Sequence, residues 1–191
     1  MKKKIILAST SPNRKELLSE TGLAFDIVHS NYEEDMTLPL APKELAMHLS
    51  KGKAMAVAEL NPEAIVIGAD TFTVHNGKII GKPHTPEKAK ETLRMFSGVS
   101  HTVVTGFTVI HLAEKREQSH AVETKVHFRN LSEAEIEAYV ATGEPLNKAG
   151  AYGIFQLGRN LIEKVEGDIS NVAGLPIATV IETLKGFGVE I

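Results

Sequence analysis

Asp70 is the residue whose type and position most strongly suggest chemistry. It follows the apolar run 64–69, which we interpret as a buried strand that ends on this carboxylate. Ligands of open α/β sheets bind at the carboxyl ends of strands, and a carboxylate there can hold a hard cation or take a proton from water. The alternative is that Asp70 only caps a turn through Thr71.

A second polar segment, residues 9–15, could bind an anion. It reads Ser-Thr-Ser-Pro-Asn-Arg-Lys and lies between the apolar run 4–8 and an amphipathic helix. Free backbone N–H groups, hydroxyls and the Arg14 guanidinium could converge there on a phosphate. The alternative is simple capping of the helix by Ser11, with Pro12 in its first turn. No Walker-type GxxxxGK[ST] motif occurs in the sequence.

Further charged residues could complete such a site. Glu33, Glu34 and Asp35 form an acidic run in which one carboxylate could help to hold magnesium, and Lys53 and Lys82 could neutralise phosphate oxygens. Acidic loops and lysines are more commonly exposed to solvent without a function, and this alternative stays open. The eight histidines lack the spacing of a zinc motif such as HExxH, and we assign them no catalytic role.

Strands and helices alternate along the chain, which predicts an α/β fold with a mixed sheet, in one domain of two lobes covering 1–191. An Asn76-Gly77 pair predicts a hairpin turn, and the stretches 102–112 and 121–128 are expected to pair. The predicted strands are 4–8, 24–29, 64–70, 71–75, 78–80, 102–112, 121–128 and 160–165. The predicted helices are one marked by Leu17, Leu18 and Leu23, then 43–60, 85–97, 132–142 and 175–187.

Composition limits the classes of function. The sequence of 191 residues contains no cysteine, which excludes disulfides and thiol chemistry and fits a reducing, cytoplasmic compartment. A net charge of −3 and an aromatic content of 5% argue against a nucleic-acid binder. No apolar run approaches the roughly 20 residues that span a bilayer, and Ser9 stops the first run too early for a signal peptide.

Six motifs occur together in an order that resembles the Maf family of nucleotide pyrophosphatases. They run over nearly the whole chain, which makes a chance match improbable. The motifs are the segment 7–14, Gly68-Ala69-Asp70-Thr71, Gly81-Lys82-Pro83, Phe96-Ser97-Gly98 with His101, the segment 148–154 (Lys-Ala-Gly-Ala-Tyr-Gly-Ile), and Gly174-Leu175-Pro176.

The resemblance implies a fold similar to the inosine triphosphate pyrophosphatases, with an elongated mixed sheet and a cleft between two lobes. It implies hydrolysis of a nucleoside triphosphate to a monophosphate and pyrophosphate with a divalent metal cation, Mg²⁺ or Mn²⁺. Asp70 matches the catalytic carboxylate and Glu34 an acidic position that helps it to hold the metal. The phosphate contacts it implies are Ser9, Ser11, Arg14, Lys53 and Lys82.

Base specificity in the family follows three positions, which here are Asn13, Thr71 and Phe155. In the dTTP/UTP branch these positions look like arginine, threonine and glutamine. In the 7-methyl-GTP branch they look like a bulky aromatic residue, a different polar residue and glutamate. Only Thr71 fits the first branch and nothing fits the second, although Gln156 could substitute if the loop slips by one residue. We therefore expect dTTP and UTP, or modified nucleotides, as substrates.

Two other readings stay open. The family is associated with arrest of septum formation, so the protein could sense a nucleotide and regulate division without turnover, and a general phosphatase would release orthophosphate instead. We expect no nucleic-acid or membrane partner. A homodimer is conceivable, with the stretch 102–112 at its edge.

Overall fold

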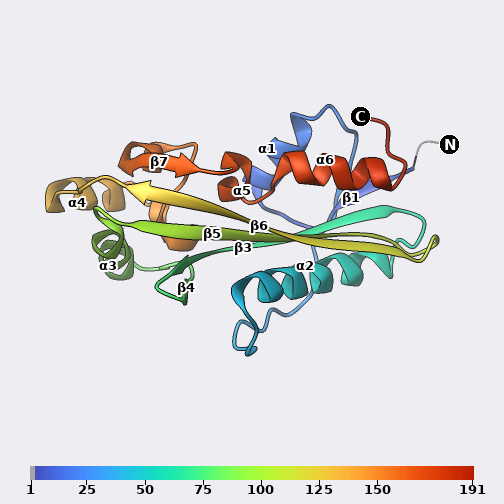
Figure 1. Ribbon diagram of the computed structural model, residues 1–191, viewed down its shortest axis with the longest axis horizontal. Helices are drawn as coiled ribbons and strands as arrows, with labels where there is room; N and C mark the ends of the chain where they lie inside the picture. Colours follow the sequence, from blue (N-terminus) through green and yellow to red (C-terminus); the bar gives the residue numbers. More distant parts are fainter. Residues whose placement is uncertain (1–2) are drawn as a thin grey trace. The chain divides into compact units, whose positions relative to one another are not determined.

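The computed structural model describes residues 3–191, which form a seven-stranded mixed sheet flanked by helices (Figure 1). The strand order is β2-β1-β3-β5-β6-β7, and β4 pairs with β3. Strand β1 is parallel to β2 and β3, while β4 runs antiparallel to β3 and β7 antiparallel to β6. The strands are β1 (Ile5–Leu7), β2 (Asp26–Ile27), β3 (Ile65–His75), β4 (Lys78–Ile80), β5 (Ser100–His111), β6 (Arg116–Phe128) and β7 (Ile162–Glu166). The α/β class predicted from sequence is confirmed.

Helices α1 to α4 lie between strands, as the alternating pattern predicted, and α5 and α6 follow the last strand. The α-helices are α1 (Pro12–Ser19), α2 (Pro42–Ala58), α3 (Pro86–Phe96), α4 (Glu133–Ala141), α5 (Ile169–Ala173) and α6 (Ile177–Gly186). Three short 3₁₀ helices, which the sequence did not predict, are η1 (Glu144–Asn147), η2 (Ala149–Ala151) and η3 (Leu157–Leu161). Within residues 3–191 no helix combines the length and apolar character needed to cross a membrane.

The chain divides into two compact units. The first contains the described part of Met1–Asp70 together with Thr105–Val122 and Gly174–Ile191, and the second contains Thr71–Val104 and Glu123–Ala173. These units agree with the two lobes predicted from sequence. The cleft expected between the lobes stays a prediction.

Helix α2 packs very closely on the sheet of the first unit. A Cβ atom on Gly68 of β3 would lie 2.4 Å from the Ser50 carbonyl oxygen, and one on Gly106 of β5 would lie 2.2 Å from the Ala46 carbonyl carbon. Backbone atoms of a packed helix cannot yield by that much without cost. The two glycines therefore set the distance between α2 and the sheet.

An apolar core joins α2 to these strands. The buried side chains of Ile6, Ala54, Val57 and Val66 belong to one cluster in which β1, α2 and β3 meet. Residues 5–8 and 64–67 are buried without alternation, as expected for strands covered on both faces. Burial of both faces of these strands explains the near-continuous apolar runs in the sequence.

The second unit has an aromatic core. The rings of Phe96 and His101 are stacked with centroids 4.1 Å apart, and Phe128 and Tyr152 pack edge-on around them. Nε2 of His101 lies 2.9 Å from the Tyr152 hydroxyl. Burial lowers the pKa of His101 to about 3, so this imidazole is neutral near pH 7.

Local signals at several element ends are confirmed. The Thr85 hydroxyl accepts a hydrogen bond from the Lys88 N–H at the start of α3. The predicted capping box of α4 is present, because the Ser132 hydroxyl accepts from the Glu135 N–H and the Glu135 carboxylate accepts from the Ser132 N–H. The β3–β4 hairpin turns at Asn76-Gly77, where both residues have positive φ, 49° and 74°.

The prediction that Asp70 ends a strand is wrong. Asp70 lies inside the eleven-residue β3, because Thr71, Phe72, Thr73 and Val74 continue the same extended chain. β-branched and aromatic residues of this kind favour a strand. The alternative of a turn capped by Asp70 through Thr71 is wrong for the same reason.

Two further expectations need correction. The segment 24–29 was expected to be a full strand, but β2 contains only Asp26–Ile27, and the Val28 N–H adds one hydrogen bond to the Leu7 carbonyl of β1. The stretch 102–112 was expected at a possible dimer edge, but β5 lies in the interior of the sheet between β3 and β6. Nearly all of β5 is buried, so its apolar character reflects the core rather than an interface between subunits.

Candidate functional site

Three predicted site residues meet in the first unit, and we call them the carboxylate–lysine cluster: Glu34, Lys53 and Asp70. The Lys53 ammonium group forms an ion pair with Oδ1 of Asp70 and another, at 2.7 Å, with Oε1 of Glu34. The side chains of Lys53 and Asp70 are only 12% and 10% exposed, whereas that of Glu34 is 44% exposed. The cluster is therefore buried on the sheet side and open on the side of Glu34.

The close approach of α2 to β3 brings Lys53 to Asp70. Side chains two apart on a strand share a face, so Asp70 points to the same side of β3 as Gly68. The place of a Gly68 Cβ is taken by Ser50 and by the Ala54 backbone N, 2.7 Å away. Lys53 lies between these two residues on α2. An alanine at position 68 would move the helix and with it the ammonium group.

The acidic loop is held against α2 by a tyrosine. A Cβ on Gly52 would lie 2.3 Å from the Tyr32 ring, so the ring packs directly on the helix backbone. The Tyr32 hydroxyl lies 3.4 Å from Nε2 of His48, one turn earlier on α2. Since Tyr32 is two residues before Glu34, this contact places the Glu34 carboxylate near Lys53.

Arg14 lies at the turn between β1 and α1. Its Nε donates to the Gly174 carbonyl at 2.8 Å, and its Nη1 donates to the Ser9 hydroxyl at 3.2 Å. Burial lowers the pKa of Arg14, and the charges of Asp70 and Glu34 act in the opposite direction. The guanidinium group therefore lies within the electric field of the two carboxylates.

The turn itself differs from simple helix capping. Pro12 occupies the first position of α1 as expected, but the Ser11 side chain makes no capping hydrogen bond to any residue the structure describes. The Ser11 N–H instead donates to the Ser9 hydroxyl at 3.3 Å. The turn thus orders Ser9 and Arg14 together, while the capping role considered for the Ser11 hydroxyl is wrong.

The cluster can accept a divalent cation. Oxygens of Glu34 and Asp70 both contact one positive group, the Lys53 ammonium, and so converge on a common point. Among residues 3–191 there is no group of three or more His, Cys, Asp or Glu side chains that could hold a metal ion. Mg²⁺ commonly takes one or two protein carboxylates and completes its shell with water and substrate phosphates. Two carboxylates therefore fit this cation.

The other acidic residues of the loop do not join the cluster. Oδ1 of Asp35 accepts hydrogen bonds from the N–H and the hydroxyl of Thr37, at 2.9 and 2.6 Å. These bonds lower the pKa of Asp35. Glu33 is exposed. Asp35 shapes the loop, and Glu34 is the member of the run that reaches Lys53.

The second unit contains the remaining predicted site residues. Lys82 is exposed, and its backbone segment is hydrogen-bonded to the segment 148–154 and the residues before it. The Gly150 N–H donates to the Gly81 carbonyl at 3.2 Å, and the His84 N–H donates to the Leu146 carbonyl at 3.0 Å. The structure thus joins two motifs that are more than sixty residues apart in the sequence.

The specificity positions lie in both units. Asn13 is on α1 in the first unit, while Thr71, Phe155 and Gln156 belong to the second. Phe155 is 53% exposed and Gln156 is also exposed. The meeting of these residues and Lys82 with the carboxylate–lysine cluster stays a prediction.

Sequence reasoning missed Tyr139 and Glu144, which hold the loop that carries Phe155. The Tyr139 hydroxyl donates to Oε1 of Glu144 at 2.8 Å, and Glu144 also accepts from the Leu157 and Gly158 N–H groups. Burial and the bond to Glu144 raise the pKa of Tyr139. Only the two glycines of 153–158, with their spacing of five, gave a signal of a tight loop.

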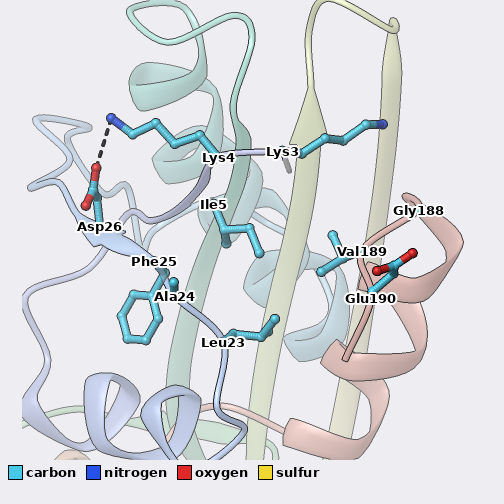
Figure 2. Close-up of a pocket in the computed structure, with 10 residues that line it drawn as sticks. All are labelled: Lys3, Lys4, Ile5, Leu23, Ala24, Phe25, Asp26, Gly188, Val189 and Glu190. Carbon is cyan, nitrogen blue, oxygen red and sulfur yellow. Dashed lines mark ion pairs between the residues drawn. The ribbon is translucent and has the colours of Figure 1, made fainter. Parts of the chain in front are cut away.

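A cavity of about 730 Å³ lies at the opposite end of β1 in the first unit (Figure 2). Lys4, Phe25 and Asp26 are among the residues that line it, and Lys4 pairs with Asp26 at 2.9 Å. None of the predicted site residues lines this cavity. It is separate from the carboxylate–lysine cluster, which lies beyond the other end of the strand.

Comparison with known proteins supplies the family. The family model described as Maf-like protein matches residues 4–187, almost the whole chain. The chain belongs to the Maf family. This confirms the resemblance carried by the six sequence motifs.

Several relatives cover nearly the full length of this Maf chain. A protein of Bacillus cereus (strain ATCC 10987 / NRS 248) named dTTP/UTP pyrophosphatase is 44% identical over 189 residues, which are 99% of this chain and 92% of the relative. Proteins with the same name from Bacillus pumilus (43%, 97% of each chain) and Pelotomaculum thermopropionicum (44%, 99% of each chain) are similar.

A solved structure supports the fold alone. The Ham1 protein of Staphylococcus aureus superposes with a TM-score of 0.53 at 14% identity, over 96% of this chain and 99% of that one. The predicted likeness to the inosine triphosphate pyrophosphatase-like fold is confirmed at the level of architecture.

Proposed function

We propose that this protein hydrolyses nucleoside triphosphates between the α and β phosphates and releases a monophosphate and pyrophosphate. The observation that carries the proposal is the carboxylate–lysine cluster beside Arg14, in a chain of the Maf family. The relatives named dTTP/UTP pyrophosphatase cover essentially the same length. We further propose that residues 1–191 act as a single catalytic domain.

Asp70 is the proposed catalytic residue. Its carboxylate has two oxygens, one of which contacts Lys53, and it can accept a proton from the water that attacks the α phosphorus. The new bond joins the water oxygen to the α phosphorus, the bond from this phosphorus to the bridging oxygen breaks, and pyrophosphate leaves with the electron pair. Asp70 is buried in β3 next to α2, which fixes the orientation of its side chain and keeps bulk water away.

Glu34 and Asp70 are the residues that would hold a divalent cation, Mg²⁺ or Mn²⁺. When bound, the cation neutralises charge on the phosphate oxygens and lowers the pKa of a water molecule. Lys53 would then turn from the two carboxylates to a phosphate oxygen. Its flexible stem allows this change, since Nζ is a compact charge on four rotatable carbons.

Positive and polar groups hold the triphosphate in this proposal. Arg14, oriented by Ser9 and by the Gly174 carbonyl, offers its guanidinium to phosphate oxygens. Lys53 offsets the negative charge that develops on the leaving pyrophosphate. Ser11 and Lys82 are proposed to contribute further phosphate contacts.

We propose pyrimidine triphosphates, dTTP and UTP, as the leading substrates. The support is the name of the relatives and Thr71, which fits that branch. Asn13 and Phe155 depart from its pattern, so modified nucleotides are included in the proposal. The purpose would be to keep such nucleotides out of nucleic acids, in the reducing cytoplasm that the absence of cysteine suits.

A nucleotide sensor of septum formation is the rival function. A sensor needs groups that donate hydrogen bonds to phosphate. It does not need a buried carboxylate, such as Asp70, that can hold a metal beside those groups. The cluster therefore favours turnover.

Hydrolysis in H₂¹⁸O separates the readings. The proposal expects one ¹⁸O atom in the thymidine monophosphate and none in the pyrophosphate when dTTP is supplied with Mg²⁺. Orthophosphate as the first product would identify a general phosphatase, and tight binding without labelled product would identify a sensor.

A further inference from the structure

The loop 153–158 of the second unit is closed at its neck. A Cβ on Gly158 would lie 2.7 Å from both the N and the O atom of Gly153, so the two glycine backbones touch. Ile154 is buried, while Phe155 and Leu157 are each 53% exposed. The loop thus projects an aromatic ring from a narrow base, and a side chain at position 158 would collide with the Gly153 backbone.

Glu144 binds this neck with two hydrogen bonds and accepts a third from Tyr139. Its Oε2 accepts from the Leu157 N–H at 3.1 Å, and its Oε1 accepts from the Gly158 N–H at 3.1 Å and from the Tyr139 hydroxyl at 2.8 Å. A charged acceptor makes stronger bonds than a neutral one, and both of its oxygens are engaged. The carboxylate therefore fixes the outgoing side of the loop.

Tyr139 binds the incoming side. Its buried hydroxyl accepts from the Gly153 N–H at 3.2 Å while it donates to Glu144. One hydroxyl thus links Gly153 at one side of the neck with the carboxylate that holds Gly158 at the other. Burial and the bond to Glu144 keep the phenol protonated, because both raise its pKa.

The clamp also places Gln156. Its Oε1 atom would be 3.0 Å from a Cβ on Gly153, so the Gln156 side chain folds back over the neck. An amide presents a donor and an acceptor side by side, which suits the edge of a nucleobase. The exposed phenyl ring of Phe155, the preceding residue, offers a face on which a base can stack.

We propose that Glu144 and Tyr139 are positioning residues for base recognition, which clamp the loop 153–158 so that Phe155 and Gln156 meet the base of a pyrimidine nucleotide in one fixed arrangement. The inference rests on the proposed function for the identity of the ligand. It adds Glu144 and Tyr139, which do not touch the reacting atoms, to the residues of the proposed function. It also explains Gly153 and Gly158 by the close contacts of the neck.

The test compares Glu144→Gln and Tyr139→Phe with the wild type. Glu144→Gln keeps the shape but replaces one acceptor oxygen by a donor, so at least one N–H of the neck loses its partner. Tyr139→Phe keeps the ring and removes only the hydroxyl, and it serves as the second variant should the first fail to fold. Glu163→Gln, an exposed carboxylate on β7, is the matched control.

Three readouts are needed, and the first two do not require turnover. Hydrogen exchange of the peptide that contains 153–158 should speed up about tenfold in both variants and stay unchanged in the control. Calorimetry with the non-hydrolysable α,β-methylene analogues of dTTP and dCTP should show about tenfold weaker binding of the dTTP analogue, with loss of discrimination between the two bases. Turnover of dTTP at saturation should fall less than about threefold, because the change lies in base binding.

Several results would overturn the inference. Faster exchange with unchanged analogue affinities would show that the clamp serves stability alone, and unchanged exchange would show that the three hydrogen bonds do not hold the loop. A wild type that binds both analogues equally would show that the loop does not read the base. A wild type that discriminates between the analogues but releases no pyrophosphate from dTTP would refute the proposed reaction and leave the clamp supported.

Discussion

The Lys53 ammonium lies 2.7 Å from Oε1 of Glu34 while it also contacts Asp70. One lysine therefore pairs with two carboxylates that come from different parts of the first unit, an acidic loop and the centre of a strand. A cation that binds the same oxygens must compete with this ammonium. In the proposed function, Lys53 is thus both a competitor of the metal and a partner of the phosphate.

Replacing Lys53 by methionine should have opposite effects on metal and substrate. Mn²⁺ should bind the nucleotide-free variant more tightly, because the competing ammonium is gone, whereas kcat/KM for dTTP should fall by about a hundredfold with the loss of a charge on the leaving group. Electron paramagnetic resonance of Mn²⁺ measures the first effect and pyrophosphate release the second. Lys51→Met is the control, since Lys51 pairs with Glu117 instead.

The close packing of α2 predicts a stability effect at Gly106. Gly106→Ala places a methyl group 2.2 Å from the Ala46 backbone and should lower the free energy of unfolding by roughly 1–3 kcal/mol or more. Gly186→Ala should cost nothing, because a Cβ there would meet no atom of residues 3–191 within 4 Å beyond its chain neighbours and its own helix. Urea unfolding of the two variants decides the point, and equal midpoints would contradict the packing described.

His101 predicts a specific dependence of stability on pH. In the unfolded chain a histidine takes up a proton below about pH 6.5, whereas burial holds the pKa of folded His101 at about 3. The unfolded state therefore binds more protons between these values, and stability falls as the pH drops through this window, by at most about 1.4 kcal/mol per unit.

His101→Gln should remove this contribution. The difference in unfolding free energy between wild type and variant should shrink as the pH is lowered from 6 to 4.5, measured by urea unfolding at each pH. A difference that is constant over this range would mean that His101 titrates alike in the folded and unfolded states.

Asn13→Arg should strengthen dTTP binding. The substitution introduces the arginine that the resemblance implies at this position for the dTTP/UTP branch. A guanidinium offers several planar donors, whereas asparagine offers one amide. We expect KM for dTTP to fall by about tenfold with little change in kcat. Lys15→Arg, an exposed position on the same helix, controls for an added guanidinium. Equal KM values for all three proteins would remove Asn13 from the specificity positions.

Much of the fold could be predicted because its signals are local. The apolar run 64–69 became the buried part of β3, and Asn76-Gly77 gave the hairpin with positive φ at both residues. The caps at Thr85 and Ser132 involve partners three residues away, which a sequence displays directly. Contacts of this range depend on residue type more than on tertiary structure.

The site was less accessible to sequence reasoning because its geometry depends on close backbone approaches. Lys53 was an ordinary solvated lysine by pattern, and it reaches Asp70 because Gly68 lets α2 come near. Glu34 was one of three acidic residues, and the Tyr32 ring on Gly52 places it. No periodicity encodes such pairs, which lie far apart in the chain.

The most direct test of the central claim is pyrophosphate release from a panel of canonical and modified nucleoside triphosphates, with Mg²⁺ or Mn²⁺ and after their removal by chelation, by the wild type and by Asp70→Asn. The account predicts metal-dependent release of pyrophosphate, fastest with dTTP or UTP, which falls at least about a thousandfold in the variant while nucleotide binding persists. Release that continues unchanged in Asp70→Asn, or a wild type that binds these nucleotides and releases nothing, would contradict it.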